Sequence, residues 1–134
     1  MSYKHGAIKF LGRYILRGFT ILSGIVIIWL LFIQRTPKLP IAVTHADKWL
    51  HAMLFGGLTL LVAIAWQRQS KTKLWLGMAL FSLATEISQG AFTTRTASSL
   101  DYLANLFGIT AAIILLLFIA LTFRVLTGRT SQTE

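Results

Sequence analysis

Four long apolar runs constrain this chain of 134 residues more than any other feature. An α-helix rises about 1.5 Å per residue, so roughly 20 apolar residues are needed to cross the hydrocarbon core of a bilayer, which is about 30 Å thick. The runs occupy residues 14–33, 48–66, 74–92 and 100–123. They are solidly apolar, whereas the strands of a membrane barrel alternate apolar with polar residues. The sequence therefore predicts an all-α, polytopic membrane protein, a single domain over residues 1–134 with four transmembrane helices in a compact bundle.

The composition agrees with this class, because 55% of the residues are hydrophobic and only 13% are charged. The basic residues before the first run are typical of a signal peptide. The run is longer than the apolar core of such a peptide, however, and no A-x-A-like cleavage site follows it before Pro37. We interpret it as an uncleaved anchor. The chain has no cysteine, which excludes a disulfide scaffold and a thiolate metal site.

The basic residues also predict an orientation. If all four runs span the membrane, both termini share a side with the loop between the second and third runs. Nine of the 13 Lys and Arg residues fall on that side. Because positive charge is retained in the cytoplasm, both termini are predicted to be cytoplasmic in a multi-pass protein of the cell membrane. The net charge of +9 is then a topology signal and an attraction to anionic lipid. The basic residues are scattered and accompany no recognition motif, which argues against a nucleic-acid partner.

Three of the four acidic residues lie within or against the apolar runs. Asp47 precedes the second run, Glu86 lies inside the third and Asp101 lies at the start of the fourth. An ionisable group in hydrocarbon costs a few kcal/mol at the least, so it is rare unless it faces a protein interior or water. Five further polar residues accompany the acids: Lys48, His51, Gln89, Arg95 and Asn105. The predicted topology places all eight at the outer end of the bundle, as one extracytoplasmic polar site.

Helical spacing places several of these residues on shared faces. Asp47 and His51 are four residues apart, as are Asp101 and Asn105, and such pairs are neighbours on a helix. Gly108 continues the second of these stripes, and small residues let membrane helices approach closely. Other small residues that could do so are Gly56, Gly57, Gly77, Ala84, Gly90, Ala111 and Ala112.

The order of these motifs resembles the VanZ-like proteins. The chain has DKWLH at residues 47–51, EISQ at 86–89, Arg95, and DYLANLFG at 101–108. These elements match the family pattern D-K-x-x-H, E-x-x-Q, R and D-x-x-x-N-x-x-G in the same order. The namesake of the family is associated with resistance to the glycopeptide teicoplanin. The resemblance implies a role in cell-envelope or lipid-linked precursor processing, and it supplies no reaction.

Several of the polar residues also have purely structural interpretations. Thr44 with Asp47, and Ser98 with Asp101, have the spacing of helix N-terminal capping boxes. Lys48 and Arg95 could extend to lipid phosphates, His51 could be an interfacial histidine, and Gln89 and Asn105 could form hydrogen bonds between helices. Glu86 has no such explanation, because it lies about six residues before the end of its run, roughly 9 Å along the helix. A functional or buried-pair role is therefore predicted for Glu86.

Two hypotheses of function follow. In the first, the polar residues form an anion- or lipid-headgroup-binding pocket for a membrane lipid or lipid-linked anionic ligand. Glu86, His51 and Asp101 are then the candidate catalytic residues, and the candidate ligand-binding residues are Asp47, Lys48, Gln89, Arg95 and Asn105. In the second, the polar layer of a non-enzymatic protein is an interhelical network or a partner-docking surface.

Other properties are less defined by the sequence. An ion-coupled transporter is disfavoured by the lack of repeats and broken helices. A bridging metal on the acids and His51 has no spacing signature, so no metal ligand is predicted. Whether the protein is an enzyme, its cofactors and its oligomeric state are left open.

Overall fold

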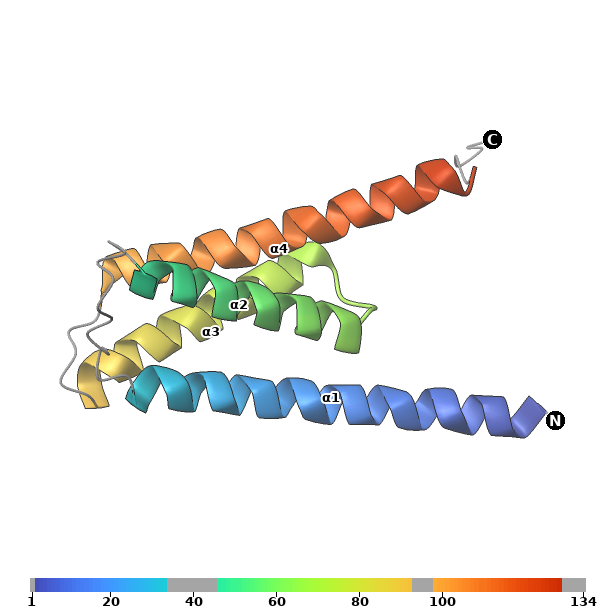
Figure 1. Ribbon diagram of the computed structural model, residues 1–134, viewed down its shortest axis with the longest axis horizontal. Coiled ribbons are helices and arrows are strands. Elements are labelled where there is room, and N and C mark those ends of the chain that lie inside the picture. The colour runs from blue at the N-terminus through green and yellow to red at the C-terminus, as the bar shows by residue number, and fades with distance from the viewer. Residues whose placement is uncertain (1, 34–45, 93–97, 129–134) are drawn as a thin grey trace.

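The computed structural model describes residues 2–33, 46–92 and 98–128, with side chains from residue 10 onward. This part of the chain folds into four α-helices: α1 (Ser2–Ile33), α2 (Ala46–Ala65), α3 (Lys71–Phe92) and α4 (Ser99–Leu126). The N-terminal end of α1 and the C-terminal end of α4 lie at the same end of the molecule (Figure 1). The ends of α1 and α3, and the beginnings of α2 and α4, lie at the opposite end (Figure 1).

The packing centres on α2. Its most extensive contact is with α4, followed by α3 against α4 and α1 against α2, whereas α1 and α4 do not contact each other within the described residues. Leu31, Phe55 and Ile109 are fully buried in the apolar core that joins these helices. The rings of Phe55 and Phe81 lie 5.9 Å apart between centroids. Each helix therefore packs against α2, against α4 or against both.

Glycines allow the close crossing of α2 and α4. A Cβ atom on Gly108 would collide with the backbone carbonyl group of Ala52, and one on Gly56 would lie 3.0 Å from the carbonyl oxygen of Gly108. By contrast, Cβ atoms on Gly57 and Gly77 would meet nothing within 4 Å. The prediction of close approach at small residues is thus confirmed for Gly56 and Gly108, and it is wrong for Gly57 and Gly77.

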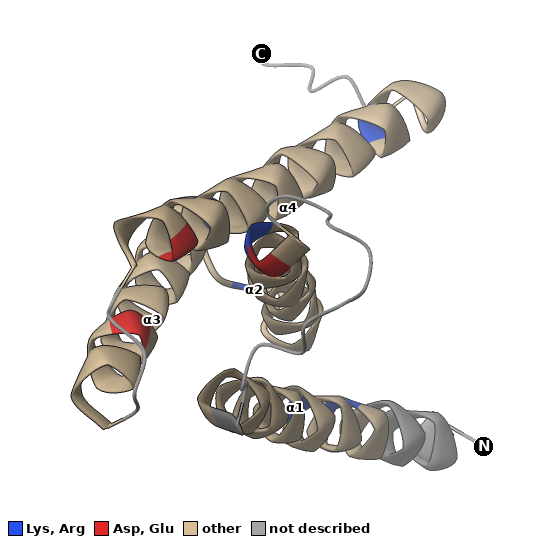
Figure 2. Ribbon diagram, turned by 60° about the vertical axis from the view of Figure 1, so that its left-hand side comes forward, with Lys and Arg blue, Asp and Glu red and all other residues tan. Residues whose placement is uncertain are grey.

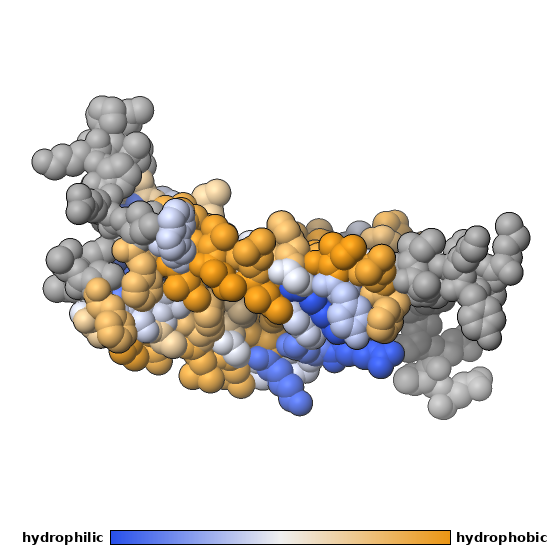
Figure 3. All heavy atoms as spheres, turned by 90° about the horizontal axis from the view of Figure 1, so that it is seen from below, coloured by the Kyte–Doolittle hydropathy of each residue, from blue (hydrophilic) through white to orange (hydrophobic). Residues whose placement is uncertain are grey.

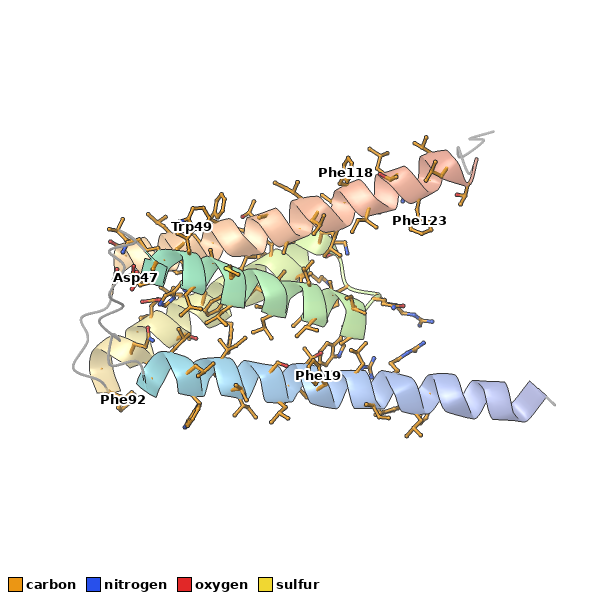
Figure 4. All side chains as sticks on the ribbon, viewed as in Figure 1. Phe19, Asp47, Trp49, Phe92, Phe118 and Phe123 are labelled. Carbon is orange, nitrogen blue, oxygen red and sulfur yellow. The ribbon has the colours of Figure 1, made fainter. Side chains whose placement is uncertain are left out.

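The outer surface of the bundle is largely apolar. Many large hydrophobic side chains are exposed on α1 and α4, and Phe118 and Phe123 project from the C-terminal half of α4 (Figure 4). A space-filling view shows a broad apolar surface interrupted by a hydrophilic area (Figure 3). A surface of this kind is unfavourable in water and suits the hydrocarbon of a membrane.

Three of the four helices contain segments long and apolar enough to cross a membrane: Phe10–Phe32, Ala46–Ala65 and Ser99–Leu126. The prediction of an all-α membrane protein agrees with this result, and the runs at 14–33, 48–66 and 100–123 correspond to these segments. The predicted fourth span at 74–92 is not confirmed, because α3 does not qualify by length and composition alone. Polar residues along α3, Glu86 and Gln89 among them, lower its hydropathy.

Candidate functional site

The three acidic residues of the described chain gather at one end of the bundle. They lie on α2, α3 and α4, near the ends of these helices that face away from the two termini (Figure 2). Asp47 lies in the first turn of α2, and Asp101 lies in the first turn of α4. Glu86 is buried on the inner face of α3. Three helices therefore contribute one carboxylate each to the same region.

His51, Asn105 and Glu86 form a buried hydrogen-bonded chain across α2, α4 and α3. Asn105 Nδ2 donates to Glu86 Oε1 at 3.3 Å, and His51 Nδ1 lies 3.1 Å from Asn105 Oδ1. With this amide orientation Oδ1 accepts, so Nδ1 of the imidazole carries the proton. His51 Nδ1 also lies 3.6 Å from Glu86 Oε1. Both His51 and Asn105 are 0% exposed, so this chain of contacts fixes how the three helices meet.

The second ring nitrogen of His51 faces the carboxylate of Asp101. His51 Nε2 lies 4.0 Å from Asp101 Oδ2. This nitrogen is buried and has no hydrogen-bond partner among the described residues. The imidazole is therefore held between the carboxylates of Glu86 and Asp101, one on each side of the ring.

Asp101 also connects the buried network to the surface. Its carboxylate Oδ1 lies 3.6 Å from Lys48 Nζ, and Lys48 pairs in turn with Asp47 at 3.2 Å. The Lys48 side chain is 27% exposed, so it forms the border between network and surroundings. Ser98 is the N-cap of α4, and its hydroxyl accepts from the backbone N–H of Asp101 at 3.2 Å. The predicted cap at Ser98 is confirmed, and it leaves the carboxylate of Asp101 in contact with Lys48.

Gln89 forms a hydrogen bond between helices, as its structural interpretation predicted. Its amide Nε2 donates to the backbone carbonyl of Leu31 at 2.8 Å, in a buried position. Leu31 belongs to the last turn of α1, where carbonyl groups lack partners within the helix. Gln89 therefore ties the end of α1 to α3.

Two buried polar residues of α3 were not singled out from the sequence. Ser82 is fully buried, and its hydroxyl has no hydrogen-bond partner among the described residues. Thr85 is buried and donates to the backbone carbonyl of Phe81 at 2.8 Å. Their spacing from Glu86 and Gln89 could have revealed them, because residues three and four apart share a helix face.

Two of the predicted positions lie outside the described residues, namely Arg95 and the proposed cap residue Thr44. In the part of the chain that the structure describes, no group of three or more His, Asp or Glu side chains is arranged to hold a metal ion. The described network thus contains three carboxylates, Lys48, His51 and Asn105.

The fold and this network define the class of the protein: an α-helical, multi-pass membrane protein with polar side chains buried among its helices. The family described as VanZ/LLP1 matches residues 6–121, which is most of the chain. The chain therefore belongs to the VanZ-like family. No curated protein and no solved structure matches it significantly.

Proposed function

We propose that this VanZ-like protein crosses the membrane four times, with both termini in the cytoplasm. The side chains of α3 support its placement in lipid. Four of its polar residues are buried, whereas four apolar residues form an exposed stripe: Ser82, Thr85, Glu86 and Gln89 against Leu76, Leu80, Leu83 and Ile87. A helix of 22 residues is about 33 Å long, enough to cross the hydrocarbon core. The excess of basic residues on the side of the termini supports the cytoplasmic orientation.

On this topology the polar network faces the outer leaflet, and we propose that it binds an anionic lipid or lipid-linked envelope precursor. The observation that carries this proposal is the buried His51 Nε2, which has no hydrogen bond in the described chain and faces Asp101. Buried polar atoms are nearly always hydrogen-bonded, so an exception calls for a functional reason. With the proton of the neutral ring on Nδ1, Nε2 can take a proton from a ligand.

The charges of the network indicate where the ligand would lie. Three carboxylates surround Lys48 and His51, so an anionic group is disfavoured in the middle. Its phosphate or carboxylate belongs at the rim, beside the partly exposed Lys48 and the N-termini of α2 and α4, which attract anions. Arg95 shortly precedes α4 in the sequence, so we expect it to assist in binding the anionic group. His51 and Glu86 would serve as acid and base, and Asp101 would hold the imidazole.

The second candidate function is a structural network or docking surface without chemistry. The complete burial of His51 and Asn105 favours it, because such hydrogen bonds hold membrane helices together at about 0.6 to 2 kcal/mol each. The two candidates differ in what a conservative substitution changes. A ligand site loses binding when its charge is removed, whereas a structural network loses stability.

The experiment compares Glu86→Gln and His51→Gln with the wild type, using native mass spectrometry with polyprenyl phosphate as the probe. Thr122→Val is the control, because Thr122 lies outside the network and, within the described residues, donates to the backbone carbonyl of Phe118 in its own helix. We expect both network variants to lose binding at least tenfold while the melting temperature stays near that of the wild type. Wild-type binding in both, at a lowered melting temperature, would establish the structural network instead.

A role in glycopeptide resistance is a separate part of the proposal. We expect expression of the wild-type protein in a susceptible bacterium to raise the teicoplanin concentration that stops growth, and expression of Glu86→Gln to leave it unchanged. Equal susceptibility of cells with and without the wild-type protein, at verified protein levels, would remove the resistance role and leave the binding proposal to its own test.

A further inference from the structure

A second polar feature lies at the opposite end of the bundle, between α1 and the turn that joins α2 to α3. A cavity of about 590 Å³ opens there, lined by residues 12–13 and 16–17 of α1 and residues 64–69 at the end of α2 and in the turn. Three of the lining side chains are guanidinium groups, those of Arg13, Arg17 and Arg68. From below, a hydrophilic area interrupts the apolar surface of the molecule (Figure 3).

Arg17 is held in place by the walls of this cavity. Its Nε donates to the backbone carbonyl of Ala65 at 3.3 Å. Its guanidinium lies 5.6 Å from the ring centroid of Trp66 and 5.8 Å from that of Tyr14. An arginine has five N–H donors, and only this one is used within the described residues. The group is therefore oriented in advance, with most of its donors available.

No acidic residue neutralises these arginines in the part of the chain that the structure describes. The ion pairs found there involve Lys48 and His51, with Asp47, Glu86 and Asp101 at the other end of the bundle. Arg13 and Arg68 are exposed and Arg17 is half-buried. Three positive charges thus border one cavity without a counter-ion from the protein, an arrangement that attracts an anion.

The position of the cavity indicates where that anion comes from. Ala65 ends the apolar segment of α2, so the cavity lies at the level where hydrocarbon gives way to headgroups. Leu16 and Ile64 line it, and they offer an apolar surface for acyl chains. Trp66 is at the depth at which tryptophan is enriched in membrane proteins. A free phosphate ion would contact only the polar part of the cavity lining and would leave the apolar part uncovered.

We propose that this cavity binds the phosphate group of an anionic phospholipid, in the leaflet on the side of the two termini. Arg17 forms the fixed wall, and Arg13 and Arg68 close on the phosphate from α1 and the turn. Guanidinium groups suit this ligand because their planar donors pair with phosphate oxygens in bidentate fashion. The lipid would link α1 to the α2–α3 turn. This site is independent of the polar network at the other end.

The test uses the full-length protein and native mass spectrometry with phosphatidylglycerol as the titrated lipid. The variant Arg13→Gln/Arg68→Gln removes two charges from the cavity and leaves Arg17 packed. The control Lys73→Gln/Arg124→Gln removes two charges from exposed residues on the same side of the bundle that do not line the cavity. We expect the cavity variant to bind phosphatidylglycerol at least tenfold more weakly, and the control to change less than twofold.

Equal weakening in both double variants would overturn the proposal, because it would indicate general attraction between a basic surface and anionic lipid. Unchanged binding in the cavity variant would overturn it too. A parallel titration with inorganic phosphate separates the two sources of the ligand. Binding of inorganic phosphate at millimolar concentration, lost in the cavity variant and without specific binding of phosphatidylglycerol, would mean that the cavity takes the free ion and not a lipid. The cavity lining shares no residue with the polar network of Lys48, His51 and Glu86, so failure of either proposal leaves the other standing.

Discussion

The crossing of α2 and α4 yields the sharpest prediction of stability, at Gly108. A methyl group added there would collide with the backbone carbonyl of Ala52. A backbone carbonyl cannot rotate away as a side chain can, so α2 itself must shift. Overpacking of this kind typically costs about 1 to 3 kcal/mol. We expect Gly108→Ala to reach the upper part of that range, because α2 and α4 share the most extensive interface of the bundle.

Two other glycines of the same protein provide a graded series. In Gly56→Ala the new methyl would lie 3.0 Å from the carbonyl oxygen of Gly108, and we expect a smaller loss. In Gly77→Ala it would meet nothing within 4 Å, and the better helix propensity of alanine should leave stability unchanged or raised by up to about 1 kcal/mol. Thermal unfolding in detergent, followed by circular dichroism, should rank Gly77→Ala highest, then the wild type, Gly56→Ala and Gly108→Ala. A Gly108→Ala protein as stable as the wild type would refute this packing of α2 on α4.

Three further outcomes are expected. Ser98→Ala should lower the free energy of unfolding, measured by chemical denaturation in detergent, by about 0.5 to 2 kcal/mol through loss of the α4 cap. Ser98→Asp should retain the stability of the wild type, because aspartate is also a good N-cap residue. Unchanged stability in Ser98→Ala would exclude the cap. Gln89→Met should lower the free energy of unfolding by about 1 to 3 kcal/mol, because the buried carbonyl of Leu31 loses its hydrogen-bond donor. Thermal unfolding measures this loss, and unchanged stability would contradict the contact between α1 and α3. Reporter fusions after residue 134 should be active in the cytoplasm and those within residues 93–98 outside it; an extracytoplasmic C-terminus would overturn the orientation and the outer-leaflet site together.

Part of the candidate site could be predicted from the sequence because the motifs lie on helices of known period. Asp101 and Asn105 share a face of α4 by spacing alone, and both prove to be buried. The cap at Ser98 could be predicted in the same way, since a serine three residues before an acidic residue is a sequence pattern that requires no tertiary contact. Glu86 was singled out by its depth in an apolar run, and it does bond to Asn105 from another helix.

What spacing could not supply was the choice of partner. Gln89 lies on the same face of α3 as Glu86, yet it bonds to the end of α1, because the orientation of one helix against the others decides which neighbour each residue meets. Gly56 and Gly57 are adjacent in the chain, and only Gly56 faces α4 closely. The cavity beside Arg17 could not be predicted from the sequence either, since its lining combines residues of α1 with residues about 50 positions later in the chain.

The sequence by itself determined the class of this protein and the approximate positions of its helices. Long apolar runs permit little else than membrane helices, because the backbone must satisfy its own hydrogen bonds in hydrocarbon. The tertiary structure alone decided that the imidazole of His51 lies between two carboxylates, and that three arginines border one cavity at the far end. Side chains far apart in the chain meet only through the packing of helices, and that packing depends on the fit of all the faces at once.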